Sequence, residues 1–335
     1  MSDPLSIIEQ FPRLKVLVIG EAILDRYLYG CATRLCQETP VPVVTLSHWV
    51  DQPGGAANTA VNLRSLGAQV HLFSVIGHDW EGVRLQEALL EQSISTQSIL
   101  VDPNRVTLTK QRVIDGDRLL LRFDQGSTQA IAPHSETTLI KSLKAAWHKA
   151  DAVIISDYSY GILTPSVISA IAALQKQAPK TLVIDAKDLS LYRALNATAV
   201  KPNYQQILTL LNETKLLDDK KCSRVDYIQT NASTILNLTG ATIAAVTLDQ
   251  EGAIILQHRK TPYRIHATPA CPTRTIGAGD TFTATFTIAL ASGASPAIAA
   301  DLAAAAAAIV VNKSGTALCT IKELKSNFLS AVSRS

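Results

Sequence analysis

The stretch Thr275-Ile276-Gly277-Ala278-Gly279-Asp280-Thr281 places two glycines and a carboxylate directly before a segment with helical periodicity. Apolar residues recur in that segment at i, i+4, i+7 and i+8, the pattern of one buried helix face. They are Phe282, Phe286, Ala289 and Leu290. Gly293 stands where a C′ glycine would end the helix. We therefore expect Gly277 to Asp280 to form the N-terminus of this helix.

A helix N-terminus that begins with glycines is suited to bind an anion. Glycines let the backbone approach a ligand closely, and the helix dipole adds partial positive charge there. Asp280 would repel a phosphate at this place, unless it takes a proton from the group that attacks the phosphorus. The alternative is an ordinary N-cap aspartate after a tight turn, which stabilises a helix by about 1 kcal/mol. The motif alone leaves both interpretations open.

A second glycine pair opens another helical segment, Pro53-Gly54-Gly55-Ala56-Ala57-Asn58-Thr59-Ala60-Val61-Asn62, with Leu66-Gly67-Ala68 behind it. Together the two stretches resemble the signature regions of the ribokinase-like (PfkB) carbohydrate kinases. The similarity runs from about Val16 to near the C-terminus. It is greatest to the branch that phosphorylates D-glycero-β-D-manno-heptose 7-phosphate. Five segments carry the match to this branch: LDRY at 24–27, TPVPVV at 39–44, TKQRV at 109–113, SDY at 156–158 and NKSGT at 312–316.

Length and charge are consistent with one large enzyme domain. The 335 residues are 47% hydrophobic, enough for a large core, and no linker divides them. We expect residues 1–335 to form a single kinase domain. The net charge of +3 and the absence of a Lys/Arg run argue against a nucleic-acid partner.

Cysteines and apolar runs predict a cytoplasmic protein that does not bind a membrane. The five cysteines form no CxxC pair, and their odd number suits reduced thiols better than a disulfide scaffold. The N-terminus, with Asp3 and Glu9, does not resemble a signal peptide. The longest apolar run, 302–311, is far shorter than the roughly 20 residues of a membrane span.

Short β-type segments alternate with helical patterns along the chain, as in a parallel sheet built from βαβ units. The expected strands are 16–19, 70–76, 152–156, 181–185, 199–201, 243–248 and 253–257. The expected helices are 56–66, 81–92, 133–149, 165–177, 204–211, 224–238, 280–292 and 296–312. We therefore predict an α/β fold with a doubly wound, mostly parallel sheet flanked by helices, which the resemblance also implies.

Two segments, at about 24–50 and 105–124, interrupt this alternation. They are rich in Val, Leu and Thr with alternating charge, which favours antiparallel strands. In the resembled family such strands form a small lid over the sugar, and often the contact between two subunits. The resemblance thus implies a β lid inserted in the domain and a homodimer through this lid.

Other nucleotide-binding motifs are missing from the sequence. None of the sixteen glycines is followed by lysine, which excludes a Walker A loop. Gly20-Glu21-Ala22-Ile23-Leu24 does not match the GxGxxG of a dinucleotide site. No HxGH nucleotidyl-transfer motif is present either, although enzymes of the resembled branch are often fused to an adenylyltransferase that carries one. We therefore expect the kinase half alone.

The motif and the resemblance together imply phosphoryl transfer from ATP to a sugar hydroxyl. The N–H groups of Gly277, Ala278 and Gly279 would stabilise charge on the transferring oxygens. Asp280 would accept the hydroxyl proton. Mg²⁺ would offset the charge of the ATP phosphates, and the sequence does not indicate its ligands.

The resemblance assigns Asp25, Gly54, Gly55 and Asn58 to contacts with sugar hydroxyls. Asp25 follows the first expected strand, where doubly wound sheets bind their ligands. Its alternative role is that of a turn or cap residue. The glycine pair by itself would also fit a plain tight turn.

Three basic residues of the lid segments are candidates to bind a phosphate that the sugar already carries. Lys110 and Arg112 are two residues apart and so share a strand face, with Arg122 on the next strand. The alternative interpretation is that these residues lie on the solvated face of an edge strand. For the nucleotide, the resemblance gives five further candidates, each of which could be an ordinary loop or strand-end residue: Lys201, Asn203, Thr247, Gly252 and Asn312.

Five residues depart from the family's motifs. Arg274 replaces an aspartate that helps to bind a monovalent cation in many relatives, and its charge could substitute for that cation. Gln206 replaces the glutamate of Asn-x-x-Glu, which weakens the support of Mg²⁺. Asp249 stands near the nucleotide phosphates, where glycine or serine is usual. Tyr160 and Gln37 replace a lysine and a proline.

Three functions remain open from the sequence. The first is a kinase for a heptose phosphate or a related sugar phosphate. The second is a PfkB kinase for another sugar, such as ribose or fructose, in which the basic lid residues are only surface. The third is a degenerate homologue that binds a nucleotide or a protein partner without turnover. Asp280 and its two glycines argue against the third, because an inactive protein needs no base.

Overall fold

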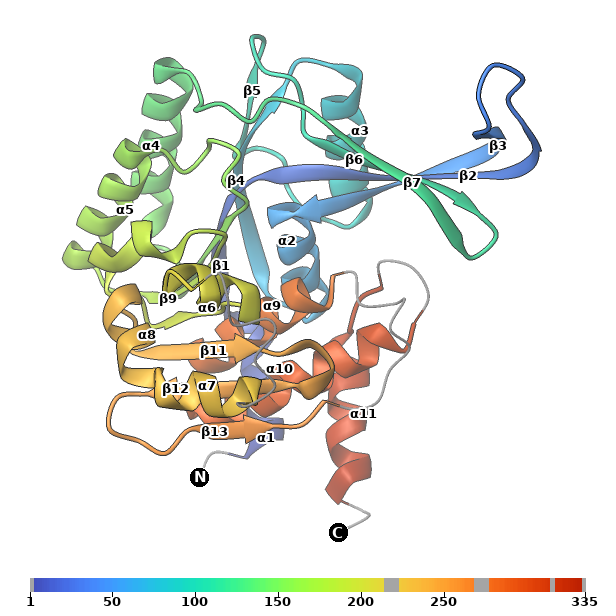
Figure 1. The fold of residues 1–335 in the computed structure, drawn as a ribbon. Helices are drawn as coiled ribbons and strands as arrows, with labels where there is room; N and C mark the ends of the chain where they lie inside the picture. The colour runs from blue at the N-terminus through green and yellow to red at the C-terminus, as the bar shows by residue number, and fades with distance from the viewer. Residues whose placement is uncertain (1–2, 214–222, 268–276, 314–316, 333–335) are drawn as a thin grey trace.

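The computed structural model describes residues 3–213, 223–267, 277–313 and 317–332. Its central sheet has nine strands, β1 (Lys15–Gly20), β4 (Gln69–Gly77), β5 (Ile99–Asp102), β8 (Ala152–Asp157), β9 (Thr181–Ala186), β10 (Ala199–Val200), β11 (Ile243–Thr247), β12 (Ala253–Gln257) and β13 (Tyr263–Ile265). Their order is β13-β12-β11-β10-β9-β8-β1-β4-β5 (Figure 1). All neighbours from β11 to β5 pair in parallel, and β12 and β13 add two antiparallel strands at one edge.

Helices cover both faces of this sheet because its strands bury side chains on both. In β1, Val16 and Val18 join one hydrophobic core, and Leu17 and Ile19 join the other. The first core includes α1 (Pro4–Gln10), α2 (Ala56–Ser65), α3 (Trp80–Glu91), α9 (Ala278–Ala291), α10 (Pro296–Val311) and α11 (Ile321–Val332). The second includes α4 (Pro133–Trp147), α5 (Pro165–Gln177), α6 (Tyr204–Leu210), α7 (Arg224–Thr230) and α8 (Ala232–Thr239). Three short 3-10 helices are η1 (Phe11–Arg13), η2 (Leu189–Leu195) and η3 (Asp249–Glu251).

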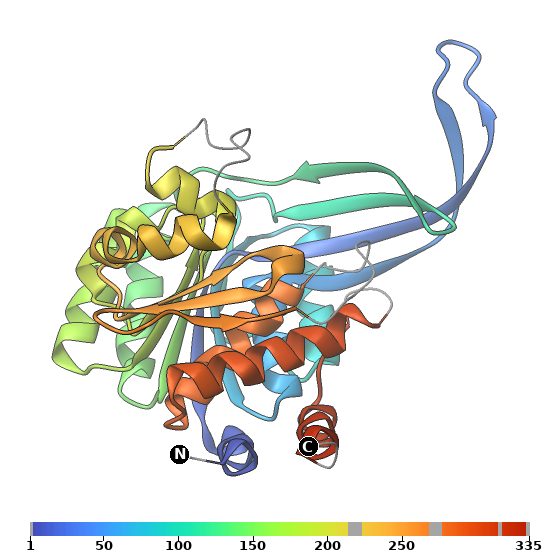
Figure 2. The ribbon, with the colours of Figure 1, turned by 60° about the horizontal axis from the view of Figure 1, so that its bottom comes forward.

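A second sheet of four strands forms the lid. Its strands are β2 (Ala22–Leu35), β3 (Pro42–Gly55), β6 (Thr109–Asp115) and β7 (Arg118–Gln125), in the order β3-β2-β6-β7. β2 pairs antiparallel with β3 and parallel with β6, so the two lid segments expected from the sequence meet along β2. The lid projects from the body as a long twisted ribbon (Figure 2). The first residues of β2 are buried and its last residues are exposed, because only the base of the lid contacts the body.

Charged side chains fasten the base of the lid to α3. The Asp51 carboxylate of β3 accepts hydrogen bonds from Nε of Arg26 on β2, at 2.6 Å, and from Nε of Arg84 on α3, at 3.1 Å. Glu81 of α3 lies 3.7 Å from the Arg26 guanidinium. Burial opposes ionisation of Asp51, yet the hydrogen bonds from the two arginines hold its pKa below the ordinary value. These ion pairs connect the lid to the body of the protein.

Most elements expected from the sequence are present close to their predicted bounds, and the doubly wound α/β fold is confirmed. The prediction of a single helix at 224–238 is wrong. The chain breaks there at Asn231, whose side-chain amide donates to the carbonyl of Tyr227 at 3.0 Å, between α7 and α8. Seven elements were not predicted: α1, α11, β5, β13 and the three 3-10 helices. The two strands have four and three residues, too few to show a period. No helix among the described residues is long and apolar enough to cross a membrane.

We expect Asp51→Asn to destabilise the protein by about 3 kcal/mol, because it leaves two arginines facing a buried neutral group. The Asp51 side chain is only 2% exposed. Glu87→Gln is the matched control, since it removes another carboxylate partner of Arg84 that is 49% exposed. It should cost less than about 1 kcal/mol. Denaturant unfolding of the two variants measures both losses, and equal losses would contradict this role of Asp51.

Candidate active site

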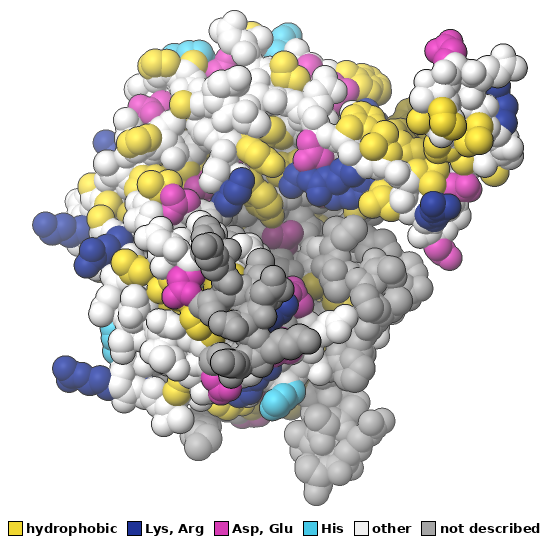
Figure 3. All heavy atoms as spheres, viewed as in Figure 1, with side chains coloured by type: hydrophobic (Ala, Val, Ile, Leu, Met, Phe, Trp, Pro, Cys, Tyr) yellow, Lys and Arg dark blue, Asp and Glu magenta, His cyan; other side chains and the backbone are white. Residues whose placement is uncertain are grey.

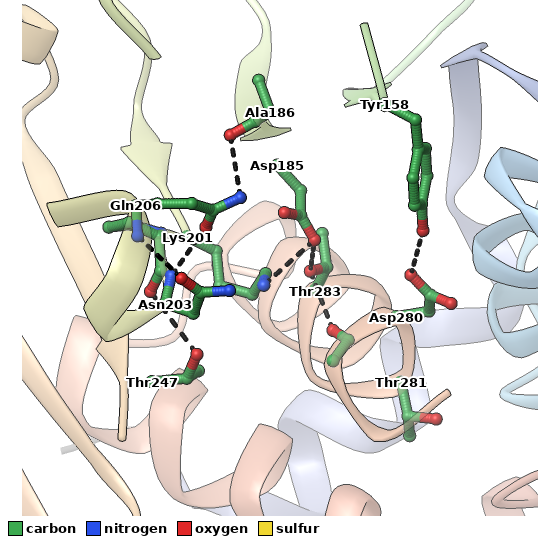
Figure 4. Close-up of polar contacts among 12 residues, drawn as sticks. Tyr158, Asp185, Ala186, Lys201, Asn203, Gln206, Thr247, Asp280, Thr281 and Thr283 are labelled. Carbon is green, nitrogen blue, oxygen red and sulfur yellow. Dashed lines mark hydrogen bonds and ion pairs between the residues drawn. The ribbon is translucent and has the colours of Figure 1, made fainter. Parts of the chain in front are cut away.

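A cleft of about 410 Å³ opens at the carboxyl ends of the central strands, beside the start of α9 (Figure 4). Doubly wound sheets bind their ligands at this edge because strand ends and helix N-termini meet there. β8 and β9 each bring an aspartate to the cleft, and Lys201 follows β10. The lining residues are Asp157, Tyr158, Tyr160, Asp185, Lys187, Lys201, Asn203, Gln206, Gly277, Gly279 and Asp280.

The N-terminus of α9 lies in this cleft, as the sequence predicts. Gly277 is the N-cap and has φ +83°, a left-handed conformation that glycine adopts without strain. Among the described residues, a side chain at Gly279 would meet only Nζ of Lys201, at 3.8 Å, so the described part of the structure leaves this backbone open to a ligand. The first N–H groups of a helix have no partner within it. They can therefore donate to a bound anion.

Asp280 is the third residue of α9, and so the N-cap interpretation of this aspartate is wrong. Its Oδ2 accepts a hydrogen bond from Nδ2 of Asn58 at 2.6 Å, and its Oδ1 accepts one from the Tyr158 hydroxyl at 3.3 Å. Burial raises the pKa of Asp280 to about 6, against the hydrogen bond from Asn58. The nearby Asp185 charge acts with burial, and Lys201 acts against it. A carboxylate with such a pKa is a suitable general base near neutral pH.

Asn58 is itself held in place by its neighbours on α2 and α9. Nδ2 of Asn62 donates to the Asn58 carbonyl at 2.9 Å and to its Oδ1 at 3.3 Å. The Thr281 hydroxyl then donates to Oδ1 of Asn62 at 2.7 Å. Because its own Oδ1 accepts from Asn62, the Nδ2 of Asn58 faces Asp280 as a donor. This chain of hydrogen bonds fixes the orientation of the candidate base.

The side of the cleft where the sequence analysis expects the nucleotide contains Lys201, Asp185 and the start of α6. Nζ of Lys201 lies 3.1 Å from Oδ2 of Asp185, which also accepts from the Thr283 hydroxyl at 3.0 Å. Asn203 and Gln206 form a capping box at the start of α6, with reciprocal hydrogen bonds of 2.7 and 2.8 Å. Gln206 therefore has a local structural role that does not need the charge of a glutamate.

The acceptor candidates lie at the base of the lid. Asp25 and Arg112 form a buried ion pair in which Nη1 donates to Oδ1 at 2.7 Å. A side chain at Gly54 would overlap the Asp25 carboxylate, so only glycine fits beside it. Arg112 also lies over the ring of Tyr27, at 5.1 Å. The alternative that Arg112 belongs to a solvated lid face is therefore wrong, since its side chain is buried.

The other two basic candidates of the lid differ in their partners. Both Nε and Nη2 of Arg122 donate to the Asp124 carboxylate, and these two side chains are exposed. Nζ of Lys110 lies 4.7 Å from the centre of the Tyr158 ring. Among the described side chains, no carboxylate lies within ion-pair distance of Lys110. Of the three basic residues, Lys110 is therefore the one whose ammonium group has no carboxylate partner among the described residues. It can bind an anionic acceptor.

The remaining nucleotide candidates lie outside the lining of the cleft. Thr247 is next to Asn203 through a parallel bridge. Gly252 has φ +87°, and a side chain there would overlap the Ile265 carbonyl, which is a structural reason for glycine. Asn312 caps the end of α10, where its amide donates to the Ala308 carbonyl at 2.7 Å.

One further departure from the family's motifs, Asp249, can also be placed. Asp249 has φ +51°, a left-handed conformation that aspartate tolerates better than most residues. Its exposed carboxylate lies 3.5 Å from Arg224 and so has a cation beside it. Arg274 lies outside the described residues, as do residues 314–316 of the last matching segment.

The sequence analysis gave no role to four residues of the cleft, Asp157, Tyr158, Asp185 and Lys187. Tyr158 was noted only as part of a matching segment, and nothing local indicates that it contacts Asp280. Asp185 ends the expected strand 181–185. A carboxylate at the end of a buried parallel strand was the available signal, since neighbouring strand ends share one edge.

Comparison with known proteins places the chain in a family. A model of the "pfkB family carbohydrate kinase" matches residues 13–323. The "Bifunctional protein HldE" of Desulfatibacillum aliphaticivorans is 34% identical over 94% of this chain and 63% of that protein. This chain therefore belongs to the pfkB family of carbohydrate kinases. Carbohydrate kinases of this family are phosphotransferases with a hydroxyl acceptor. The chain spans about 63% of the length of that curated relative.

Solved structures confirm the ribokinase-like fold. Phosphofructokinase-2 from Escherichia coli, in complex with substrates and products, has a TM-score of 0.75 and 20% identity, covering 95% of this chain and 98% of that one. Ribokinase from Arabidopsis thaliana, complexed with ribose and ATP, has a TM-score of 0.70 and 18% identity, covering 94% of this chain and 98% of that one. At these identities the likeness shows the fold alone.

Proposed function

We propose that this chain phosphorylates a hydroxyl of a heptose 7-phosphate or a closely related sugar phosphate, as the kinase half of an ADP-heptose pathway. The observation that carries the proposal is the pairing of Asp280 with the open N-terminus of α9 in one cleft, next to a lid that presents Lys110. The resemblance of the lid segments to heptose-phosphate kinases supports the choice of acceptor.

In this mechanism Asp280 takes the proton from the attacking hydroxyl. Its two side-chain hydrogen bonds, from Asn58 and Tyr158, hold the carboxylate toward the start of α9. The N–H groups of Gly277, Ala278 and Gly279 face the transferring phosphoryl group and stabilise its charge. Each such donor contributes about 3 kcal/mol to catalysis where it has been measured in other enzymes. On the nucleotide side, we assign Lys201 and Asn203 to the ATP phosphates, with Thr247, Gly252 and Asn312 further out.

The cleft also fits a Mg²⁺ ion carried by ATP. Mg²⁺ in such sites binds mainly to phosphates and water and needs only one or two protein carboxylates. Asp185 offers one at the cleft, consistent with the absence of any cluster of three acidic, His or Cys ligands among the described residues. When bound, the ion would neutralise charge on the ATP phosphates. Gln206 supports this region through its hydrogen bond to the Ala186 carbonyl, at 3.1 Å.

On the acceptor side, the ion pair of Asp25 with Arg112 suggests a division of roles. Asp25 would bind sugar hydroxyls together with Gly54, Gly55 and Asn58, and Arg112 would hold the Asp25 carboxylate in place. Lys110 would bind the phosphate of the acceptor, with Arg122 on the neighbouring strand β7. Figure 3 shows Lys and Arg side chains gathered where the lid meets the body.

Two other functions have weaker support. A kinase for ribose or fructose would use the same base and would leave Lys110 without an acceptor anion. A degenerate homologue is favoured only by the departures at Gln206, Asp249 and Arg274. The first two have structural roles in this fold, as a capping box and a left-handed turn, that do not require loss of activity.

We also propose that the protein is a cytoplasmic homodimer that associates through the lid. Several large apolar side chains of β3 and β7 are between 40% and 57% exposed: Leu46, Trp49, Leu119, Leu121 and Phe123. Hydrophobic side chains gather on the lid in Figure 3. An exposed apolar patch of this kind is typical of a protein interface. The free thiols of Cys31, Cys36 and Cys319 suit a reducing compartment.

Asp280→Asn should lower kcat by about 100- to 10,000-fold, because the variant cannot accept the hydroxyl proton. ATP affinity should change little, since Asp280 is not assigned to the nucleotide. In the wild type, kcat should fall as the pH drops below about 6, where Asp280 becomes protonated. Asp301→Asn is the control, since Asp301 of α10 accepts from the Tyr263 hydroxyl and does not line the cleft. Unchanged turnover in Asp280→Asn would refute the mechanism.

Lys110→Met should raise KM for a phosphorylated acceptor roughly 10- to 150-fold and leave KM for its unphosphorylated analogue unchanged. Arg112→Ala should raise KM for both acceptors, because it leaves Asp25 buried without its partner. KM for ATP should stay nearly constant in both variants. Steady-state kinetics with the two acceptors checks this division. An equal effect of Lys110→Met on both acceptors, or none on either, would favour the kinase for a plain sugar.

Leu121→Asp should convert the proposed dimer into monomers, because it places a charge in the apolar face of the lid. Sedimentation or light scattering measures the mass at a concentration where the wild type is dimeric. Leu191→Asp is the matched control, since Leu191 is 54% exposed and lies on η2, outside the lid. A wild type that is monomeric, or a dimer that survives Leu121→Asp, would contradict the lid interface.

A further inference from the structure

Tyr158 lies between the lid and the candidate base and contacts both. It directly follows β8, and its backbone N–H donates to the buried Glu21 carboxylate at 2.8 Å. Its hydroxyl donates to Oδ1 of Asp280 at 3.3 Å (Figure 4). Nζ of Lys110, on lid strand β6, lies 4.7 Å from the centre of its ring. One side chain thus connects the lid with α9.

The chemistry of these contacts determines how Tyr158 acts on the Asp280 carboxylate. Burial raises the pKa of Tyr158 well above its ordinary value, and the Asp280 charge adds to this, so the hydroxyl remains a proton donor at every working pH. A cation over an aromatic ring withdraws electron density from it. Lys110 therefore makes the Tyr158 hydroxyl a stronger donor to the carboxylate.

We propose that Tyr158 is a positioning residue that couples the lid to the general base: Lys110 on its ring strengthens the hydrogen bond of its hydroxyl, which favours the ionised form of Asp280. The proposal deepens the proposed function, because it takes Asp280 to be the base. It assigns a role to a residue that does not itself accept the substrate proton.

Other groups around Asp280 also influence whether its carboxylate is ionised. Asn58 of α2 donates to Oδ2, the other carboxylate oxygen. The Asp185 carboxylate of β9 and the Asp25 carboxylate of β2 oppose ionisation, and Lys201 after β10 favours it. Tyr158 is the side chain that donates to Oδ1 among the described residues. Removal of its hydroxyl leaves that oxygen without a side-chain donor from the described part of the chain.

Tyr158→Phe keeps the buried ring and removes only the hydroxyl. It should raise the pKa of Asp280 by about one pH unit, because a hydrogen bond to the charged form is lost. Carboxyl ¹³C NMR titration of the whole protein measures this pKa without any substrate, with the Asp280 signal identified by its absence in Asp280→Asn. Tyr263→Phe is the matched control. It removes a tyrosine hydroxyl that donates to another carboxylate, Asp301, at 2.9 Å, and should leave Asp280 unchanged.

Lys110→Met tests whether the lid acts through the hydroxyl. It should raise the pKa of Asp280 in the wild-type background and have no further effect in the Tyr158→Phe background. An equal rise in both backgrounds would mean that Lys110 acts on Asp280 directly, and would overturn the coupling. If Tyr158→Phe does not fold, an unchanged Asp280 pKa in Lys110→Met overturns the proposal.

Kinetics provides the second measurement. In Tyr158→Phe the acid limb of the kcat profile should move upward by the same amount as the Asp280 pKa, with KM for ATP and acceptor nearly unchanged. A fall in kcat at all pH values without movement of the limb would indicate a merely structural residue and refute the proposal. If no sugar phosphate is turned over by the wild type but the NMR shifts are present, the proposed acceptor is wrong and the positioning role of Tyr158 stands.

Discussion

The burial of the Asp280 carboxylate is the constraint on which the site depends. A carboxylate removed from water is costly to ionise unless hydrogen bonds and nearby charges compensate. Here Asn58 and Tyr158 each donate to one of its two oxygens, and the start of α9 adds the positive end of a helix dipole. The result is a pKa of about 6, which keeps the group ionised and still basic near neutral pH. Each of these partners comes from a different element, so the base exists only when α2, β8 and α9 are packed together.

The lid is tied to this site by ion pairs as well as by backbone pairing. Asp51 joins β2 and β3 to α3 through two arginines, and Asp25 joins β2 to β6 through Arg112. Both aspartates are almost inaccessible to solvent, so each arginine is needed to compensate a buried charge. Gly54 follows from the same constraint, because no side chain fits beside Asp25. Arg112, which the sequence suggests as a phosphate ligand, is therefore also part of the support of the acceptor site.

Residues that differ from the family's motifs are explained in part by local structure. Gln206 completes a capping box with Asn203, a task that glutamine and glutamate perform equally well. Asp249 occupies a left-handed turn and lies beside Arg224, so its charge is compensated within the protein. Neither change removes a donor or the base from the cleft. The N-terminus of α9, which we propose to bind phosphate, and Asp280 are both present in the cleft.

The sequence by itself determined the local features: the helix that begins at Gly277, the alternation of strands and helices, and the placement of Asp280 at a helix N-terminus. These follow from periodicity and turn chemistry, which act over a few residues. Only the tertiary structure decided that Tyr158 donates to Asp280 across 122 residues and that Arg112 pairs with Asp25 across 87. Such contacts depend on the order of the strands in two sheets, which brings together segments that lie far apart in the sequence. The short edge strands β5 and β13 could not be predicted because they show no period of their own. Each belongs to the sheet only through its pairing with one neighbour, β4 or β12.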